Sequence, residues 1–398
     1  MKPLKILIVT GRFPPFEYRA ISQVSFDQAC ILAQKGLDVT VLTKSNGPHS
    51  HVDTVNNINV HYVGRPNYNV SSWEYSPLIW NWVYTDYIHS RIIPGDFDLI
   101  HVHDIDFALP MHFLAKIMRI PLLSHFHVCF RKRAEIGEAH FNIELAHYYQ
   151  YAMAKAATAV LTVSESEREN IGNFLDCRCK IFVVPNGIKT EGYHVCPDKK
   201  SELRRKLGFQ NSFLVLWGGR IGDWMKSPDI VGKAFSKVAA STKKARFIVS
   251  VVNNSPPENH DYFLSDLSSE ARSQTQFFYP KNKDDLLDLF AIADLFVMPS
   301  RYEPFGLMAL EAMACGVPII ISSVCEIAER LNPGEAGLMI DLGSPDESAN
   351  SLSDGIIQLA NDEKLRMTFS QNARLAANEF EMNKVADKLI EIYNLVLH

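Results

Sequence analysis

The chain has 398 residues, of which 47% are hydrophobic and 21% are charged, and its formal net charge at pH 7 is -5. This length allows two domains that each bury their own core, and the composition is that of a soluble globular enzyme. The acidic balance gives no reason to expect nucleic acid as a partner. No apolar run approaches the roughly 20 residues of a membrane span, and no signal-peptide pattern precedes the first strand, so we expect a cytoplasmic protein.

Seven cysteines make an odd number. Cys30, Cys129 and Cys315 lie inside apolar patterns, whereas Cys177 and Cys179 form a single C-x-C pair. We therefore expect neither a disulfide framework nor a cysteine-based zinc site.

The first part of the chain alternates strands and helices. Residues 5–10 are an apolar strand, residues 21–34 have helical spacing and stop at Gly36, and residues 39–43 form the next strand. This order begins a doubly wound sheet. A dinucleotide fingerprint needs three glycines after the first strand, and only Gly11 is present there, so a Rossmann cofactor site is not expected.

Residues 67–93 are rich in tryptophan and tyrosine. Trp80, Tyr84 and Tyr87 fall on one helical face, which favours core packing over an acceptor groove or a membrane-facing surface.

Residues 98–103 and 121–127 are predicted strands that each end in two histidines, at positions 101, 103, 125 and 127. By the period of two, His101 shares a strand face with His103, and His125 shares one with His127. The four converge if the two strands are neighbours. Hydrogen-bonded buried histidines are the favoured interpretation, because no carboxylate-rich loop completes a metal site.

The remainder of the first domain follows the same alternation. Residues 141–157 are a long helix, and residues 159–163 and 181–184 are strands. Ser164 and Glu167 form a capping box at the start of the helix between these strands. Polar residues 189–212, with a short helix over 201–207, are expected to link the domains.

A second strand-loop unit begins at residue 213. The apolar run 213–217 is followed by the sequence GGRIGDWMKSP, in which Arg220 and Lys226 flank a glycine-containing turn. A guanidinium and an ammonium suit the two phosphates of a diphosphate, and Gly218 and Gly219 leave room for close backbone approach. A Gly-Gly-Arg turn is weak evidence when it stands alone.

The stretch over residues 300–321 reads SRYEPFGLMALEAMACGVPIII. Its apolar spacing predicts a short helix that begins near Gly306 and Leu307 and ends at Gly316. The helix joins two buried strands, residues 294–298 and 317–321. Its first amides are a ready anion site, and Glu303 and Glu311 can accept hydrogen bonds from hydroxyls on either side of a bound phosphate. A capped helix with one solvated and one structural glutamate explains the spacing equally well.

This stretch resembles, almost residue for residue, the E-x7-E signature of the retaining GT-B-fold glycosyltransferases of family 4. The resemblance implies that Glu303 contacts hydroxyls of the donor sugar and that Glu311 holds the ribose. It assigns donor binding also to Gly219, Phe305, Gly306 and Leu307, and it makes Arg220 and Lys226 the diphosphate-binding Arg-x5-Lys pair. The stretch PLLSHFH is similar to the family segment whose last histidine, here His127, faces the sugars. The resemblance thus implies four catalytic residues, namely His127, Arg220, Lys226 and Glu303.

Two departures from the family pattern stand out. Arg19-Ala20-Ile21 replaces a Gly-Gly pair of many members, and Ser322 to Glu326 replaces a Gly-Gly-x-x-Glu turn. The first puts in question how the N-terminal domain meets the acceptor and the donor phosphates.

The resemblance implies two Rossmann-like, doubly wound parallel-sheet domains facing across a cleft. Residues 1–190 are the expected acceptor domain, residues 191–380 the nucleotide-sugar domain, and residues 381–398 a helix that crosses back. The expected activity is that of a retaining hexosyltransferase that uses a nucleoside-diphosphate sugar, with a UDP-sugar as the expected donor, and no metal or other cofactor. The acceptor is open, as is contact with a membrane surface. Two alternatives remain: a metal-dependent hydrolase built on the four histidines, and a non-catalytic sugar-nucleotide-binding protein.

Overall fold

The computed structural model describes residues 2–15, 21–64, 76–91, 97–103, 105, 107–137, 141–193, 197–251, 257–330 and 335–398. These form two compact units: unit 1 comprises Met1–Gly187 and Met382–His398, and unit 2 comprises Ile188–Glu381. Both are α/β units built on a sheet, as the sequence predicts. The departure at Arg19-Ala20 and the aromatic residues 67–75 lie outside the described residues. None of the described helices is both long and apolar enough to span a bilayer.

Unit 1 contains an eight-stranded sheet in the order β3-β4-β2-β1-β5-β6-β7-β8. The strands are β1 Lys5–Val9, β2 Asp38–Lys44, β3 His51–Val55, β4 Ile58–Val63, β5 Leu99–His103, β6 Leu122–Phe126, β7 Ala159–Thr162 and β8 Lys180–Val183. All pairs are parallel except β3 with β4. The sheet is therefore mixed, and sequence analysis missed this edge hairpin. Its signal is the turn at Asn56 and Asn57, both with positive φ (49° and 63°), between two alternating segments.

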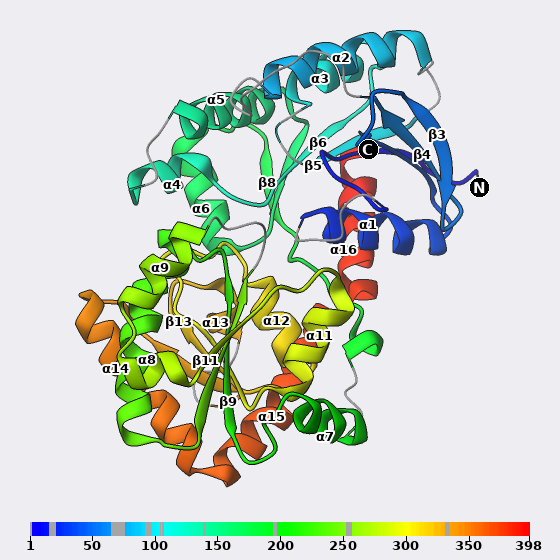
Figure 1. The fold of residues 1–398 in the computed structure, drawn as a ribbon. Coiled ribbons are helices and arrows are strands. Elements are labelled where there is room, and N and C mark those ends of the chain that lie inside the picture. The colour runs from blue at the N-terminus through cyan, green and yellow to red at the C-terminus, as the bar shows by residue number, and fades with distance from the viewer. Residues whose placement is uncertain are drawn as a thin grey trace. The chain divides into compact units, whose positions relative to one another are not determined.

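The alternation along β1 separates two cores. Ile6 and Ile8 face a core shared with α1 (Ile21–Gln34) and α16 (Met382–Leu397), which pack against each other (Figure 1). Leu7 and Val9 face the opposite core. That second core contains residues of α2 (Ser76–Arg91), α3 (Ala108–Met118), α5 (Phe141–Ala156) and α6 (Glu165–Phe174). Its members include Tyr84 and Tyr87, so the core-packing interpretation of these two aromatic residues is confirmed.

Unit 2 contains a six-stranded, fully parallel sheet in the order β11-β10-β9-β12-β13-β14. Its strands are β9 Phe213–Gly219, β10 Ala245–Val251, β11 Thr275–Phe278, β12 Leu295–Met298, β13 Ile319–Ser322 and β14 Gly337–Ile340. Alternate residues of β9 share a core with α8 (Pro228–Ser241) and α14 (Pro345–Asn361). Helices α11 (Lys283–Ile292) and α12 (Leu307–Ala314) also pack on the sheet, and α12 contacts both β12 and β13.

Both glycine caps predicted from the sequence are confirmed. After α12, the Gly316 N–H donates to Met313 O at 2.8 Å and the Val317 N–H donates to Ala312 O at 2.9 Å. Gly316 has φ +75°, a left-handed conformation that glycine adopts without steric cost. Gly36 has φ +88° and ends α1 with the same pair of hydrogen bonds, in which its own N–H donates to Ala33 O.

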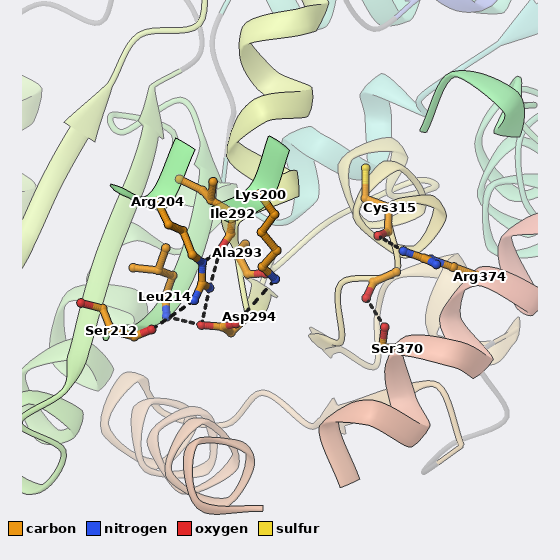
Figure 2. Close-up of polar contacts among 11 residues, drawn as sticks. Lys200, Arg204, Ser212, Leu214, Ile292, Ala293, Asp294, Cys315, Ser370 and Arg374 are labelled. Carbon is orange, nitrogen blue, oxygen red and sulfur yellow. Dashed lines mark hydrogen bonds and ion pairs between the residues drawn. The ribbon is translucent and has the colours of Figure 1, made fainter. Parts of the chain in front are cut away.

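Two polar anchors hold the C-terminal ends of α11 and α12 (Figure 2). Arg204, on α7 (Pro197–Lys206), donates to Ile292 O at the end of α11 and pairs with Asp294 at 2.6 Å. Asp294 Oδ2 in turn accepts from the Leu214 N–H of β9 at 2.9 Å. On α15 (Glu363–Ala377), Arg374 donates to Cys315 O at 3.1 Å, which secures the end of α12. The short helix expected in the interdomain link is therefore an integral part of unit 2.

Candidate functional site

The cations and carboxylates singled out in the second half of the chain follow two neighbouring strands. Strand β9 ends at Gly219 and its neighbour β12 ends at Met298. Arg220 and Lys226 lie in the loop after β9, and Glu303 lies in the loop after β12. In parallel α/β sheets this carboxyl edge is where ligands bind.

Lys226 and Glu303 form the central contact of this edge. Lys226 Nζ donates to Glu303 Oε2 at 2.5 Å, and the two side chains are 25% and 14% exposed. The ammonium is thus fixed beside the carboxylate while part of it remains in contact with solvent. The arrangement leaves it able to interact with an anion that binds at the same edge.

Arg220 is oriented by a separate carboxylate. Its guanidinium pairs with Asp223, whose Oδ1 also accepts from the Met225 N–H at 3.1 Å and so starts the 3-10 turn η3 (Trp224–Lys226). The Arg220 side chain is 52% exposed. Both cations of the predicted pair therefore belong to one short loop, and each has a carboxylate partner.

The glycines of this edge allow the first turn of α12 to approach β9. A Cβ on Gly218 would overlap Met308 Cε, and one on Gly219 would lie 3.4 Å from Lys226 Cγ. The space at Gly218 is therefore occupied by a side chain of α12, whereas the sequence interpretation reserved it for a ligand. Close packing at Gly218 brings the first turn of α12 against the end of β9.

Gly306 is the N-cap of α12 and has φ 102°. It provides no side-chain cap, so the first amides of the helix remain available to an anion. A Cβ on Gly306 would also lie 2.7 Å from Cys325 Sγ. Cys325 belongs to the segment that departs from the family pattern, and its thiol donates to Phe305 O at 3.3 Å. This departure therefore supports the loop that carries Glu303.

Glu311 lies one turn into α12, where Tyr193 Oη donates to its Oε1 at 3.0 Å. Lys283 Nζ lies 4.8 Å from the centre of the Tyr193 ring. Sequence analysis did not identify Tyr193, because it lies in the polar segment that was assigned to the link. Tyr193 holds the carboxylate that is expected to bind a ribose.

Arg301 is the second residue that sequence analysis missed. Its guanidinium forms two hydrogen bonds with Asp229, at 2.7 and 2.6 Å, and donates to Trp224 O at 3.0 Å. Its backbone N–H donates to Met225 O at 2.8 Å. Burial alone would raise the pKa of Asp229, but the hydrogen bond and charge of Arg301 outweigh this and lower it. Arg301 thus ties the loop of Lys226 to the loop of Glu303.

The four histidines of unit 1 converge as predicted, because β5 and β6 are neighbours in the sheet. His127, just after β6, is partly exposed, and its Nε2 lies 3.0 Å from His103 Nδ1. Burial lowers the pKa of His127 to about 4. His127 is therefore neutral at pH 7 and can act as a hydrogen-bond partner.

The backbone after His127 is held by two buried side chains. Glu167 Oε2 accepts from the Cys129 N–H at 2.5 Å. Gln150 accepts from the Phe130 N–H at 3.2 Å and donates to Val128 O at 2.6 Å. The predicted capping box is confirmed in its serine half, since Ser164 Oγ accepts from the Glu167 N–H. The Glu167 carboxylate, however, reaches across to the loop of His127.

Comparison with known proteins identifies the family. Residues 22–191 match the sequence model described as Glycosyltransferase Family 4, and residues 199–376 match the one described as Glycosyl transferases group 1. An uncharacterized glycosyltransferase of Methanocaldococcus jannaschii is 26% identical over 99% of both chains. A D-inositol 3-phosphate glycosyltransferase of Corynebacterium aurimucosum is 24% identical over 91% of this chain and 87% of its own.

Solved structures show the same fold. Sucrose-phosphate synthase from Thermosynechococcus elongatus superposes with a TM-score of 0.80 at 18% identity and covers 99% of both chains. HepE of Anabaena, in complex with UDP-glucose, superposes with a TM-score of 0.74 at 18% identity over 98% of this chain and 99% of its own. These matches do not favour a hydrolase built on the histidines or a silent binding protein. The chain belongs to the GT-B-fold glycosyltransferases of group 1 and family 4.

Proposed function

We propose that the protein transfers a sugar from a nucleoside-diphosphate donor to an acceptor hydroxyl with retention of anomeric configuration. The observation that carries the proposal is the Lys226–Glu303 pair beside the uncapped N-terminus of α12. This edge combines cationic and amide donors for a diphosphate with a carboxylate for sugar hydroxyls. A UDP-sugar is the proposed donor, because HepE of Anabaena was solved with UDP and with UDP-glucose.

The chemistry follows from where charge develops. Departure of the nucleoside diphosphate builds negative charge on the leaving oxygen. Fixed cations and amide dipoles stabilise such charge without reorganisation, and this is commonly the largest catalytic contribution. Lys226, Arg220 and the amides of Gly306 and Leu307 take this role. We therefore propose that the transfer requires no metal ion.

The carboxylates position the donor. Glu303, held by Lys226, orients hydroxyls of the transferred sugar, and Phe305 lies in the same loop. Glu311, held by Tyr193, binds the ribose. Gly219 gives the diphosphate access to the backbone. His127 is the proposed contact of unit 1 with the sugar or the acceptor.

A thermal-shift panel of UDP-, GDP- and ADP-sugars tests the donor. A ligand that binds only the folded state raises the melting temperature by an amount set by its concentration relative to Kd. We expect UDP-sugars to raise the melting temperature most, and the Glu311→Gln variant to show a smaller rise. Equal or absent shifts for all donors contradict the proposal. Retention is tested by NMR of the product, in which the new glycosidic bond should keep the anomeric configuration of the donor.

A further inference from the structure

The histidine cluster of unit 1 is built into the centre of its sheet. His101 and His103 lie on β5, His125 lies on β6, and His103 is the direct register partner of His125. All three are fully buried. The ring centres of His101 and His103 are 4.4 Å apart, and those of His103 and His125 are 4.8 Å apart. Three imidazoles thus share one interior space.

Hydrogen bonds connect the histidines in two short chains. Tyr393 Oη lies 2.7 Å from His101 Nδ1, and His101 Nε2 lies 3.2 Å from His125 Nδ1. The other chain is the bond between His103 Nδ1 and His127 Nε2. Within the described parts of the chain, Nε2 of His103 and Nε2 of His125 are buried and have no hydrogen-bond partner. Among the same described residues His127 Nδ1 is also buried without a partner, so the first chain leaves one ring nitrogen unused and the second leaves two.

Such unused nitrogens are costly in a protein interior. A buried polar atom without a partner costs about 1–3 kcal/mol relative to a satisfied one. A neutral imidazole has one N–H and one lone pair. When His103 Nδ1–H donates to His127, His103 Nε2 carries a lone pair. His101 Nε2 and His125 Nδ1, 3.2 Å apart, both present lone pairs to a cation when the hydrogen bond between them is given up and the protons lie on His101 Nδ1 and His125 Nε2.

We propose that His101, His103 and His125 bind one divalent transition-metal ion. One ring nitrogen of each lies within 4.8 Å of the others. Ligand nitrogens of a tetrahedral zinc ion with bonds of about 2.0–2.1 Å are roughly 3.3 Å apart, so small rotations of the side chains bring the set to binding distance. Imidazole ligands suit Zn²⁺, Ni²⁺ and Cu²⁺ better than Mg²⁺ or Ca²⁺.

The neighbours of the cluster fit this assignment. Metal-bound histidines are usually oriented by a hydrogen bond to their second ring nitrogen. Tyr393 provides this bond to His101, and His127 provides it to His103.

The three proposed ligands all belong to unit 1, where His103 also contacts His127, the proposed partner of the sugar or the acceptor. The ion would link β5 to β6 and, through Tyr393, to α16, so its effect is to stabilise unit 1 and to fix His103 beside His127. This inference does not depend on the donor assignment, because its test measures metal binding directly.

The test uses the tag-free full-length chain after treatment with a chelator and buffer exchange. Isothermal titration with Zn²⁺ should give one ion per chain and a higher melting temperature, and Co²⁺ should give the visible absorption of a nitrogen-ligated tetrahedral site. Zinc X-ray absorption of the wild type should count three imidazoles, a readout that requires no variant. Loss of one ligand in His103→Gln or His125→Gln should weaken binding by at least about 100-fold, because loss of an outer-shell partner alone costs about 10–100-fold.

His89→Gln is the matched control, since His89 is an exposed histidine on α2. It should bind zinc as the wild type does. The proposal is overturned if the wild type binds no stoichiometric ion, if the absorption data show fewer than three imidazoles, or if folded His103→Gln and His125→Gln retain wild-type affinity. If the variants do not fold, the ligand count in the wild type decides.

Discussion

Lys226 Nζ lies 2.5 Å from Glu303 Oε2, so the residue proposed to bind the diphosphate and the residue proposed to bind the sugar hold each other in place. The loops after β9 and β12 are thereby coupled by charge as well as by the Arg301–Asp229 pair. Since both side chains of the Lys226–Glu303 pair remain partly exposed, solvent moderates the strength of the bridge. Its main consequence is orientation of the two groups.

Lys226→Ala should therefore reduce turnover far more than stability. Removing one charged donor from a developing anion costs about 3 kcal/mol, which is about a hundredfold in rate. Arg220→Ala should behave similarly. Lys233→Ala is the control, because Lys233 also pairs with a carboxylate, Asp346, but on α8 and α14. Near-wild-type kcat in both site variants would remove the diphosphate assignment.

Arg301→Lys should destabilise the protein by about 2 kcal/mol and lower turnover with it. A lysine cannot keep both bonds to Asp229 and the bond to Trp224 O, and the site is only 13–16% exposed. Urea unfolding measures the first effect and kcat the second. Arg168→Lys, at an exposed ion pair with Glu165, should change stability by less than about 0.5 kcal/mol. Equal, small losses of stability in both variants would show that Arg301 does not hold the loops of Lys226 and Glu303 together.

The sequence predicted those parts of the candidate site whose residues lie close together along the chain. Glu303, Gly306, Glu311 and the cap at Gly316 lie in one continuous stretch whose spacing determines its helix. Sequence analysis did not identify Tyr193 and Arg301 because their partners, Glu311 and Asp229, are distant in sequence, at separations of 118 and 72 residues. The Glu167 carboxylate was misassigned for a similar reason: a cap is a local pattern, and the competing Cys129 amide is 38 residues away. The β3–β4 hairpin was missed although Asn56-Asn57 marked it.

Transfer should continue in excess EDTA, because protein cations and amides provide the charge stabilisation. Chelation should remove an ion from the histidine cluster and lower the melting temperature, while kcat measured well below that temperature stays within about twofold. A donor-dependent assay with and without EDTA, followed by Zn²⁺ or Mg²⁺ restoration, measures both. Loss of activity that a single divalent ion restores would contradict metal-independent transfer.

Acid should destabilise unit 1 from about pH 6.5 downward. Burial lowers the pKa of His101 to about 3, whereas an unfolded histidine has a pKa of about 6.5. Between these values the unfolded chain binds more protons than the folded one, so unfolding becomes easier as pH falls. Each such histidine costs roughly 2 kcal/mol between pH 7 and 5. Urea unfolding in EDTA at pH 7, 6 and 5 should show this slope, and His101→Gln should flatten it. An unchanged slope in His101→Gln, with His89→Gln as the reference, would count against the assignment.

His127→Ala should combine a modest loss of stability with a large loss of turnover. The stability loss, about 1–3 kcal/mol, arises because His103 Nδ1 loses its partner inside the sheet. The loss of turnover arises if the partly exposed His127 ring contacts the sugar or the acceptor, and it should exceed about 100-fold per folded molecule.

Two comparisons separate the roles of His127. Val160 is a fully buried residue of β7, the strand that neighbours β6. Val160→Ala should lower the free energy of unfolding by a similar amount and leave turnover per folded molecule unchanged. Binding of the free nucleoside diphosphate should be unaltered in His127→Ala, because every proposed donor-diphosphate contact lies in unit 2. If His127→Ala matches Val160→Ala in both stability and kcat, His127 is a structural member of the histidine cluster and takes no part in transfer.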